Sequence, residues 1–126
     1  MSDTSTSNGR TGPRPGHNQR LGAIGEELAA SWYRRRGYRI VDRNWRTRNG
    51  ELDLIVARPR ELVICEVKTR TSRRYGHPLE AVNATKQARI RRLALAYVAA
   101  TGARGRLRFD IACVEQGEVE VWQAAF

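Results

Sequence analysis

The chain has 126 residues and a formal net charge of +10 at pH 7, which is long enough for one domain that buries its own core. Its two cysteines, Cys65 and Cys113, both lie in apolar runs, so a disulfide framework and a cysteine-ligated zinc site are excluded. No segment has the apolar length of a signal peptide core or a membrane span. We therefore expect a cytoplasmic protein without a membrane partner.

The N-terminal segment is rich in Ser, Thr, Gly and Pro and has almost no apolar side chain. Such a segment cannot offset the entropy of ordering, so we predict a disordered tail over 1–19 and one domain over 20–126. The tail holds only Arg10, Arg14 and Asp3, which leaves a charge of +10 − 1 = +9 on the domain. A domain this basic suits phosphate backbones, although ribosome contact or nonspecific membrane association also fits the charge.

Hydrophobic periodicity predicts two helices and five strands. The first helix begins at Leu21 and ends at Gly37, with an apolar face at Leu21, Ile24, Leu28 and Trp32. The second lies within 80–100, with an apolar face at Ile90, Leu93, Ala94, Tyr97 and Ala100. Strands are predicted over 38–41, 51–57, 62–69, 107–115 and 118–122, with tight turns at 48–50 and 58–61. The predicted order is αβββαββ.

Two charged residues stand out in the third predicted strand. Glu66 and Lys68 alternate along it, so they share one face of the sheet. Apolar residues occupy both faces of this strand, which is typical of a strand covered on both sides. Charges in such a place need partners or a metal ion.

The preceding strand supplies a partner for Glu66 in one register. If the turn holds an even number of residues, Ala57 faces Leu62 and Asp53 stands opposite Glu66, with Cβ atoms about 5 Å apart. An odd turn without a bulge would place the two acids on opposite faces. The predicted turn over 58–61 has four residues.

Two neighbouring carboxylates favour a hard cation, magnesium or manganese, with Asp53 and Glu66 as its ligands. Such a site performs phosphodiester chemistry, in which Lys68 positions or deprotonates a water or stabilises the transition state. Of the 23 basic residues, 21 are arginines and only Lys68 and Lys86 are lysines. Since arginine is the default here, a lysine at position 68 indicates a specific task. The competing interpretation is a salt-bridged trio at the end of a sheet.

Three motifs together carry a family resemblance: Gly50-Glu51-Leu52-Asp53, Glu66-Val67-Lys68 and Arg108-Phe109-Asp110. With them, nearly everything after the tail resembles the YraN-like family of bacterial proteins. That family is similar to PD-(D/E)xK nucleases and archaeal Holliday-junction resolvases. The resemblance implies a restriction-endonuclease-like α/β fold, with an αβββαβ core and a mixed central sheet flanked by helices, and DNA cleavage dependent on a divalent metal.

The resemblance also assigns roles to residues. Asp53 and Glu66 match the acidic metal ligands, Lys68 the motif lysine and Glu26 a glutamate of the first resolvase helix; Leu52 replaces the proline of the motif name. From the helical wheel, Glu27 lies nearer the apolar face than Glu26, which favours a surface role for Glu26. For Asp110 we favour a structural ion pair with Arg108.

The residues after Lys68 are the best placed to contact nucleic acid: Arg70, Arg73, Arg74, Tyr75 and His77. The sequence thus predicts a magnesium- or manganese-dependent endonuclease acting on DNA, with branched or structured DNA as a candidate substrate. Two alternatives remain open: a non-catalytic nucleic-acid-binding module with the same fold, and an RNA-directed nuclease. By analogy with resolvases, a homodimer is a further expectation.

Overall fold

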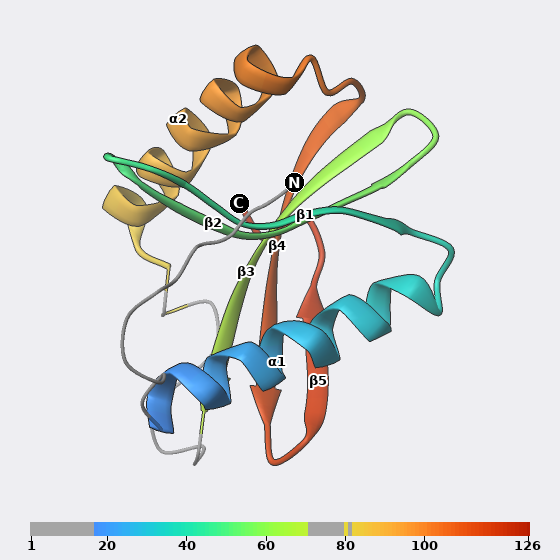
Figure 1. The fold of residues 1–126 in the computed structure, drawn as a ribbon, viewed down its shortest axis with the longest axis vertical. Coiled ribbons are helices and arrows are strands. Elements are labelled where there is room, and N and C mark those ends of the chain that lie inside the picture. Colours follow the sequence, from blue (N-terminus) through green and yellow to red (C-terminus); the bar gives the residue numbers. More distant parts are fainter. Residues whose placement is uncertain (1–16, 71–79, 81) are drawn as a thin grey trace, which may run out of the picture.

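The predicted order of helices and strands is confirmed by a computed structural model, which describes residues 17–70, 80 and 82–126. The elements are α1 (His17–Arg34), β1 (Arg39–Thr47), β2 (Gly50–Arg58), β3 (Glu61–Arg70), α2 (Ala84–Thr101), β4 (Arg106–Glu115) and β5 (Glu118–Trp122) (Figure 1). The strands form one mixed sheet in the order β1-β2-β3-β4-β5. Strands β3 and β4 run parallel, and the other neighbouring pairs are antiparallel.

Helix α1 begins earlier than predicted. It starts at His17, four residues before the predicted start at Leu21. The prediction relied on the first large apolar side chain, Leu21. Once a helix has formed, however, each residue added to its end gains one backbone hydrogen bond, so the helix can extend beyond its apolar face. Residues 1–16 lie outside the described residues.

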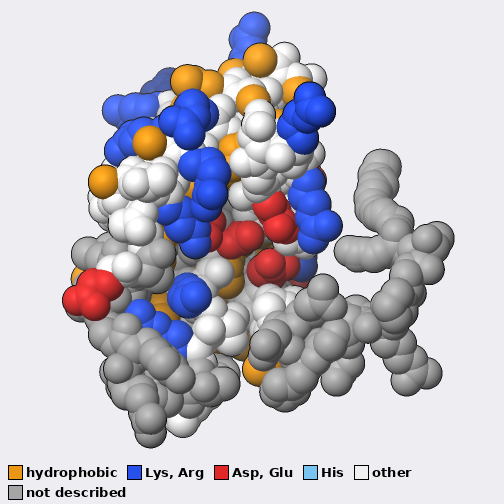
Figure 2. All heavy atoms as spheres, turned by 90° about the vertical axis from the view of Figure 1, so that its left-hand side faces the viewer, with side chains coloured by type: hydrophobic (Ala, Val, Ile, Leu, Met, Phe, Trp, Pro, Cys, Tyr) orange, Lys and Arg blue, Asp and Glu red, His pale blue; other side chains and the backbone are white. Residues whose placement is uncertain are grey.

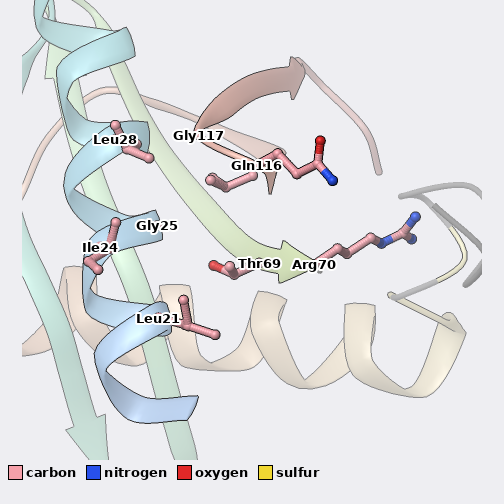
Figure 3. Close-up of a pocket in the computed structure, with 9 residues that line it drawn as sticks. Leu21, Ile24, Gly25, Leu28, Thr69, Arg70, Gln116 and Gly117 are labelled. Atoms are coloured by element: carbon pink, nitrogen blue, oxygen red, sulfur yellow. The ribbon is translucent and has the colours of Figure 1, made fainter. Parts of the chain in front are cut away.

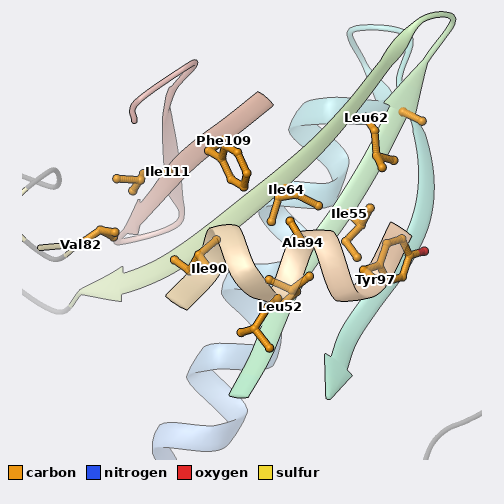
Figure 4. Close-up of a cluster of buried hydrophobic side chains, with 12 residues drawn as sticks. Leu52, Ile55, Leu62, Ile64, Val82, Ile90, Ala94, Tyr97, Phe109 and Ile111 are labelled. Carbon is orange, nitrogen blue, oxygen red and sulfur yellow. The ribbon is translucent and has the colours of Figure 1, made fainter. Parts of the chain in front are cut away.

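The two helices cover opposite faces of the sheet, because alternate residues of β2 and β3 pack in different clusters. One cluster joins Ile55, Ala57, Leu62 and Ile64 to Ile90, Leu93, Ala94 and Tyr97 of α2 (Figure 4). The other joins Leu54, Val56, Val63 and Cys65 to Ala29, Ala30 and Tyr33 of α1. Both faces of β3 are therefore covered, as predicted. Ala100, predicted for the buried face of α2, is exposed.

The buried face of α1 differs from the predicted one. Its buried residues are mostly small, namely Gly25, Ala29 and Ala30 with Tyr33, whereas Ile24 is 57% exposed. The prediction weighted large apolar residues, but a helix that approaches a sheet closely needs small ones at the contact. The sheet-facing side of α1 is thus rotated toward Gly25 and Ala29, which also moves Glu26 inward.

The closest approach of α1 to the sheet is at Gly25. A Cβ atom at Gly25 would lie 2.1 Å from Thr69 Oγ1 on β3, whereas a Cβ atom at Gly22 would meet nothing within 4 Å. Gly25→Ala is therefore expected to destabilise the protein by about 1–2 kcal/mol, because overpacking outweighs the gain in helix propensity.

The matched control is Gly22→Ala on the same helix, which gains propensity without a clash and should stabilise by up to about 1 kcal/mol. Urea denaturation of both variants measures the difference. Equal stabilisation by the two substitutions would contradict the close helix–sheet contact.

Candidate active site

The register between β2 and β3 is the one that brings the two acids together. The paired residues run from Arg58↔Glu61 to Leu54↔Cys65, and they include Ala57↔Leu62 as predicted. The turn between them holds two residues, of which Arg60 has a φ of +70°. Continuing this register by one residue places Asp53 opposite Glu66. The prediction that the turn holds an even number of residues is therefore confirmed.

Strands β2 and β3 stop pairing with each other at Asp53. Beyond this point β2 remains paired with β1 as far as Thr47↔Gly50, while β3 remains paired with β4 as far as Arg70↔Glu115. At the divergence, Asp53 Oδ2 accepts a hydrogen bond from the backbone N–H of Val67 at 2.9 Å. The carboxylate thus takes the place of a strand partner, which fixes its position beside Glu66.

Four carboxylates gather at this divergence, and we call Glu26, Glu51, Asp53 and Glu66 the acidic cluster. Asn44 of β1 joins two of them, because its Nδ2 donates to Glu26 Oε2 at 3.2 Å and to Glu51 Oε2 at 3.0 Å. Asn44 stands at the register position opposite Asp53 and has a φ of +50°, a conformation that asparagine tolerates better than most residues. The side chains come from α1, β1, β2 and β3.

Electrostatic repulsion is concentrated on Asp53. Burial raises the pKa of Asp53, and the charges of Glu66, Glu26 and Glu51 raise it further, against a lowering contribution from the Val67 hydrogen bond. Burial also raises the pKa of Glu26, with Asn44 acting in the opposite direction. Perturbed carboxyl groups of this kind are typical of functional sites and carry a cost in stability.

Both lysines of the chain border the acidic cluster. Lys86 Nζ of α2 lies 3.0 Å from Glu66 Oε2, and Lys68 is exposed two residues beyond Glu66 on β3. The contact of Lys86 was not predicted, although the rarity of lysine that singled out Lys68 applies equally to Lys86. Asn44 was likewise missed as a site residue, because nothing in a sequence reveals a positive φ at an asparagine within a strand.

The structure separates Glu26 from its neighbour Glu27. Glu27 is exposed and forms ion pairs with Arg43 at 2.9 Å and Arg34 at 3.1 Å; these hydrogen bonds lower its pKa. Glu26 instead belongs to the acidic cluster. The helical-wheel argument that placed Glu27 nearer the buried face is therefore wrong.

Most of the residues expected to contact nucleic acid cannot be placed. Arg73, Arg74, Tyr75 and His77 lie outside the described residues. Arg70 is described and its side chain is buried, with 8% exposed, so it does not lie on an exposed basic surface.

Asp110 has the structural role that we favoured. It is fully buried, and Arg108 Nε and Nη2 each donate to its carboxylate at 2.9 Å. Tyr33 Oη and the backbone N–H of Ala124 donate to it as well. Asp110 therefore ties β4 to α1 and to the C-terminal segment.

A pocket of about 260 Å³ lies elsewhere, between α1 and the ends of β3 and β4. Figure 3 shows Thr69 directed toward α1 and Arg70 directed away from it. The lining residues are Leu21, Ile24, Gly25, Leu28, Thr69, Arg70, Val114, Gln116 and Gly117. None of the acidic cluster is among them, so this pocket is separate from the candidate active site.

The donor set of the acidic cluster suits one kind of metal ion. Among the described residues, no group of three or more His, Cys, Asp and Glu side chains is arranged to hold a metal. Asp53 and Glu66 alone offer carboxylate oxygens from two strands, which matches magnesium, an ion that takes one or two carboxylates and keeps several waters. A zinc site, with three or four nitrogen or sulfur ligands, does not fit these residues.

Basic side chains surround the acidic cluster. Figure 2 shows acidic side chains gathered at the middle of one face, with Lys and Arg side chains on several sides of them. Arg46 Nε lies 3.5 Å from Glu51 Oε2, and the Arg89 side chain lies against Gly50 at the start of β2. With Lys86, these residues place positive charge on the β1–β2 hairpin and on α2.

The αβββαβ core, with acids where two central strands diverge, defines a restriction-endonuclease-like α/β domain. The fold by itself does not establish a reaction. The chain belongs to the Uncharacterised protein family UPF0102, whose model matches residues 25–114, and the YraN-like resemblance is thereby confirmed. Within the described residues, no helix combines the length and the apolarity needed to cross a membrane.

Relatives from several bacteria match most of the chain. It is 50% identical over 102 residues to a UPF0102 protein of Rhodococcus jostii, covering 80% of this chain and 86% of the relative. It is 51% identical over 102 residues to one of Nocardia farcinica, covering 80% of each chain. It is 50% identical over 101 residues to one of Symbiobacterium thermophilum, covering 79% of this chain and 86% of the relative.

Proposed function

We propose that this protein is a magnesium- or manganese-dependent endonuclease that hydrolyses phosphodiester bonds of DNA in the cytoplasm. The observation that carries the proposal is the placement of the Asp53 and Glu66 carboxylates beside each other where β2 and β3 diverge. Two mutually repelling, half-buried carboxylates raise the free energy of the metal-free protein, and a hard cation between them would relieve this repulsion. The competing interpretation, a salt-bridged trio of Asp53, Glu66 and Lys68 with only a structural role, does not explain why Glu26 and Glu51 lie in the same cluster.

Each residue of the site has a distinct task in this proposal. Asp53 and Glu66 hold the cation, and the hydrogen bond from Val67 to Asp53 keeps one carboxylate oriented before substrate arrives. A bound divalent cation supplies charge neutralisation at the phosphate and activation of water. Lys68 shares the face of Glu66 and is exposed, so its ammonium can orient the attacking water or stabilise negative charge that develops on the phosphate.

The surrounding basic side chains support a nucleic acid as the substrate. The acidic cluster alone would repel a phosphate backbone, whereas Arg46, Arg89 and Lys86 place positive charge on both of its flanks. Cations of this kind position a backbone without reading its sequence. The arrangement therefore favours a substrate that is recognised by shape, and branched DNA is the first one to test.

The proposal predicts metal-dependent cutting that requires Asp53 and Lys68. Labelled duplex, single-stranded and four-way-junction DNA, with an RNA duplex alongside, are incubated with magnesium, manganese or chelator. We expect wild type to cut DNA only with metal, and Asp53→Asn and Lys68→Ala each to lower the rate at least about 100-fold. Lys68→Arg should not restore it, because a planar guanidinium cannot replace a compact ammonium.

The carboxylate-to-amide control is Glu118→Gln, an exposed residue of β5, which should leave the rate unchanged. Binding of DNA by wild type without metal-dependent cutting of any substrate would overturn the proposal in favour of a binding module. Cutting confined to RNA would identify an RNA-directed nuclease instead.

A further inference from the structure

Lys86 occupies a position that its own helix does not favour. It lies in the first turn of α2, and its backbone N–H donates to the N-cap residue Asn83 at 2.9 Å. The N-terminus of a helix carries partial positive charge, so a cation there is unfavourable. No acidic residue in this turn offsets it. The contact that stabilises the ammonium is with Glu66 on β3, at 3.0 Å.

The choice of lysine at position 86 is also informative. The chain uses arginine at 21 of its 23 basic positions, and both exceptions border Glu66. An arginine would bind a carboxylate through two parallel hydrogen bonds from its rigid, planar guanidinium. A lysine presents a compact ammonium on a flexible stem, which can leave one oxygen acceptor for another.

The two partners differ in how freely they can move. The Lys86 side chain is 33% exposed and the Glu66 side chain 15%. The backbone around Lys86 is held by Asn83, and the neighbouring Gln87 donates through Nε2 to the carbonyl of Val82 at 3.0 Å. The ammonium can therefore swing away from Glu66 while the start of α2 and the carboxylate stay in place.

We infer that Lys86 is a built-in counter-ion that occupies Glu66 Oε2 in the metal-free protein and competes with a divalent cation for this carboxylate. The inference deepens the proposed function and rests on it, because it takes Glu66 as a metal ligand. When the cation binds, Lys86 is released and becomes available to a substrate phosphate. Lys86 thereby couples metal occupancy to the charge that the site presents to its substrate.

This competition has two measurable consequences. Without the ammonium, the acidic cluster is more negative and should bind a divalent cation more tightly. Without the ammonium and without metal, Asp53 and Glu66 repel each other unscreened, so the protein should be less stable. Metal should then raise the stability of such a variant more than that of wild type, because the stabilisation by a ligand at a given concentration increases with the logarithm of its affinity.

The test is manganese binding by isothermal titration calorimetry, together with thermal unfolding in chelator and in manganese. Lys86→Met keeps the length of the side chain and removes the charge. We expect it to bind Mn²⁺ roughly three- to fivefold more tightly than wild type, the effect of losing one partly exposed ion pair. Its Tm should be lower than that of wild type in chelator and should rise more with Mn²⁺. Lys86→Arg retains the charge, so it should show neither the tighter Mn²⁺ binding nor the larger rise in Tm with Mn²⁺.

The matched control is Arg92→Met, which removes an exposed charge from the same helix and should change Mn²⁺ affinity less than twofold. Equal or weaker Mn²⁺ binding by Lys86→Met would overturn the role of Lys86 and leave the metal site standing. If neither wild type nor Lys86→Met bound Mn²⁺, both the metal site of the proposed function and this inference would fail.

Discussion

Asp110→Ala is expected to lower the free energy of unfolding by about 3 kcal/mol or more, the scale for breaking a buried ion pair from one side. The carboxylate is fully buried and accepts hydrogen bonds from Tyr33, Arg108 and Ala124. An arginine side chain is not deprotonated in proteins, so Arg108 would stay charged after the substitution and would lose its main partner. Glu61 Oε1, 3.5 Å from Arg108 Nη1, would compensate only in part.

Urea denaturation monitored by circular dichroism measures this loss. Tyr33→Phe removes a single buried hydroxyl and should cost about 1–2 kcal/mol. Glu118→Ala, an exposed carboxylate on β5, should change stability by no more than about 0.5 kcal/mol. A loss for Asp110→Ala no larger than that of the surface control would contradict the buried network.

Asp53→Asn, unlike Asp110→Ala, is expected to raise the free energy of unfolding of the metal-free protein, by about 1–2 kcal/mol. This corresponds to a rise in Tm of roughly 4–10 °C for a domain of this size. The amide still accepts the hydrogen bond from Val67 but does not repel Glu66. Stability gained by removing a charge is the signature of a site built for a ligand that the metal-free protein lacks.

The pH dependence of stability follows from the direction in which the pKa of Asp53 is shifted. Burial and the charge of Glu66 raise the pKa of Asp53 from its ordinary value of 3.8 to about 8, so folding favours the protonated form. The contribution of this group to stability is complete at low pH and is lost as pH rises through this interval. The difference in Tm between Asp53→Asn and wild type, measured in chelator, should therefore grow from pH 4 to pH 8. A constant difference would contradict the raised pKa.

Much of the fold was predictable because short-range rules determine it. A two-residue turn at Pro59-Arg60 sets the register of β2 against β3, and that register alone aligns Asp53 with Glu66. Tight turns limit the possible pairings so strongly that the acid pair follows from counting residues. The continuous run of apolar residues from Leu62 to Cys65 on β3 likewise predicts that both faces of this strand are covered.

The packing of α1 was less predictable, because it depends on the distance between a helix and a sheet. Large apolar side chains suggested a buried face that includes Ile24, whereas Gly25 and Ala29 allow the helix to approach β3 on another side. The rotation reverses the relative placement of Glu26 and Glu27. A helical wheel treats hydrophobicity as the only criterion and has no information on how closely two elements pack.

The contacts of Asn44 and Lys86 were unpredictable for a different reason. Each joins elements that no turn constrains, β1 to α1 for Asn44 and α2 to β3 for Lys86. Long-range side-chain contacts of this kind depend on the assembled fold. Only the scarcity of lysine offered a signal, and it identifies an unusual residue without naming its partner.

The parallel pairing of β3 with β4 has a consequence for how the protein is made. Strand β3 carries Glu66 and Lys68, yet it is paired along its whole length with residues 106–115 near the end of the chain. During synthesis the first three strands emerge as a hairpin meander whose open edge is β3 itself. Residues 106–115 must therefore be synthesised before this edge is covered, so β3 stays an unpaired strand edge while the 35 residues 71–105 between the two strands are made.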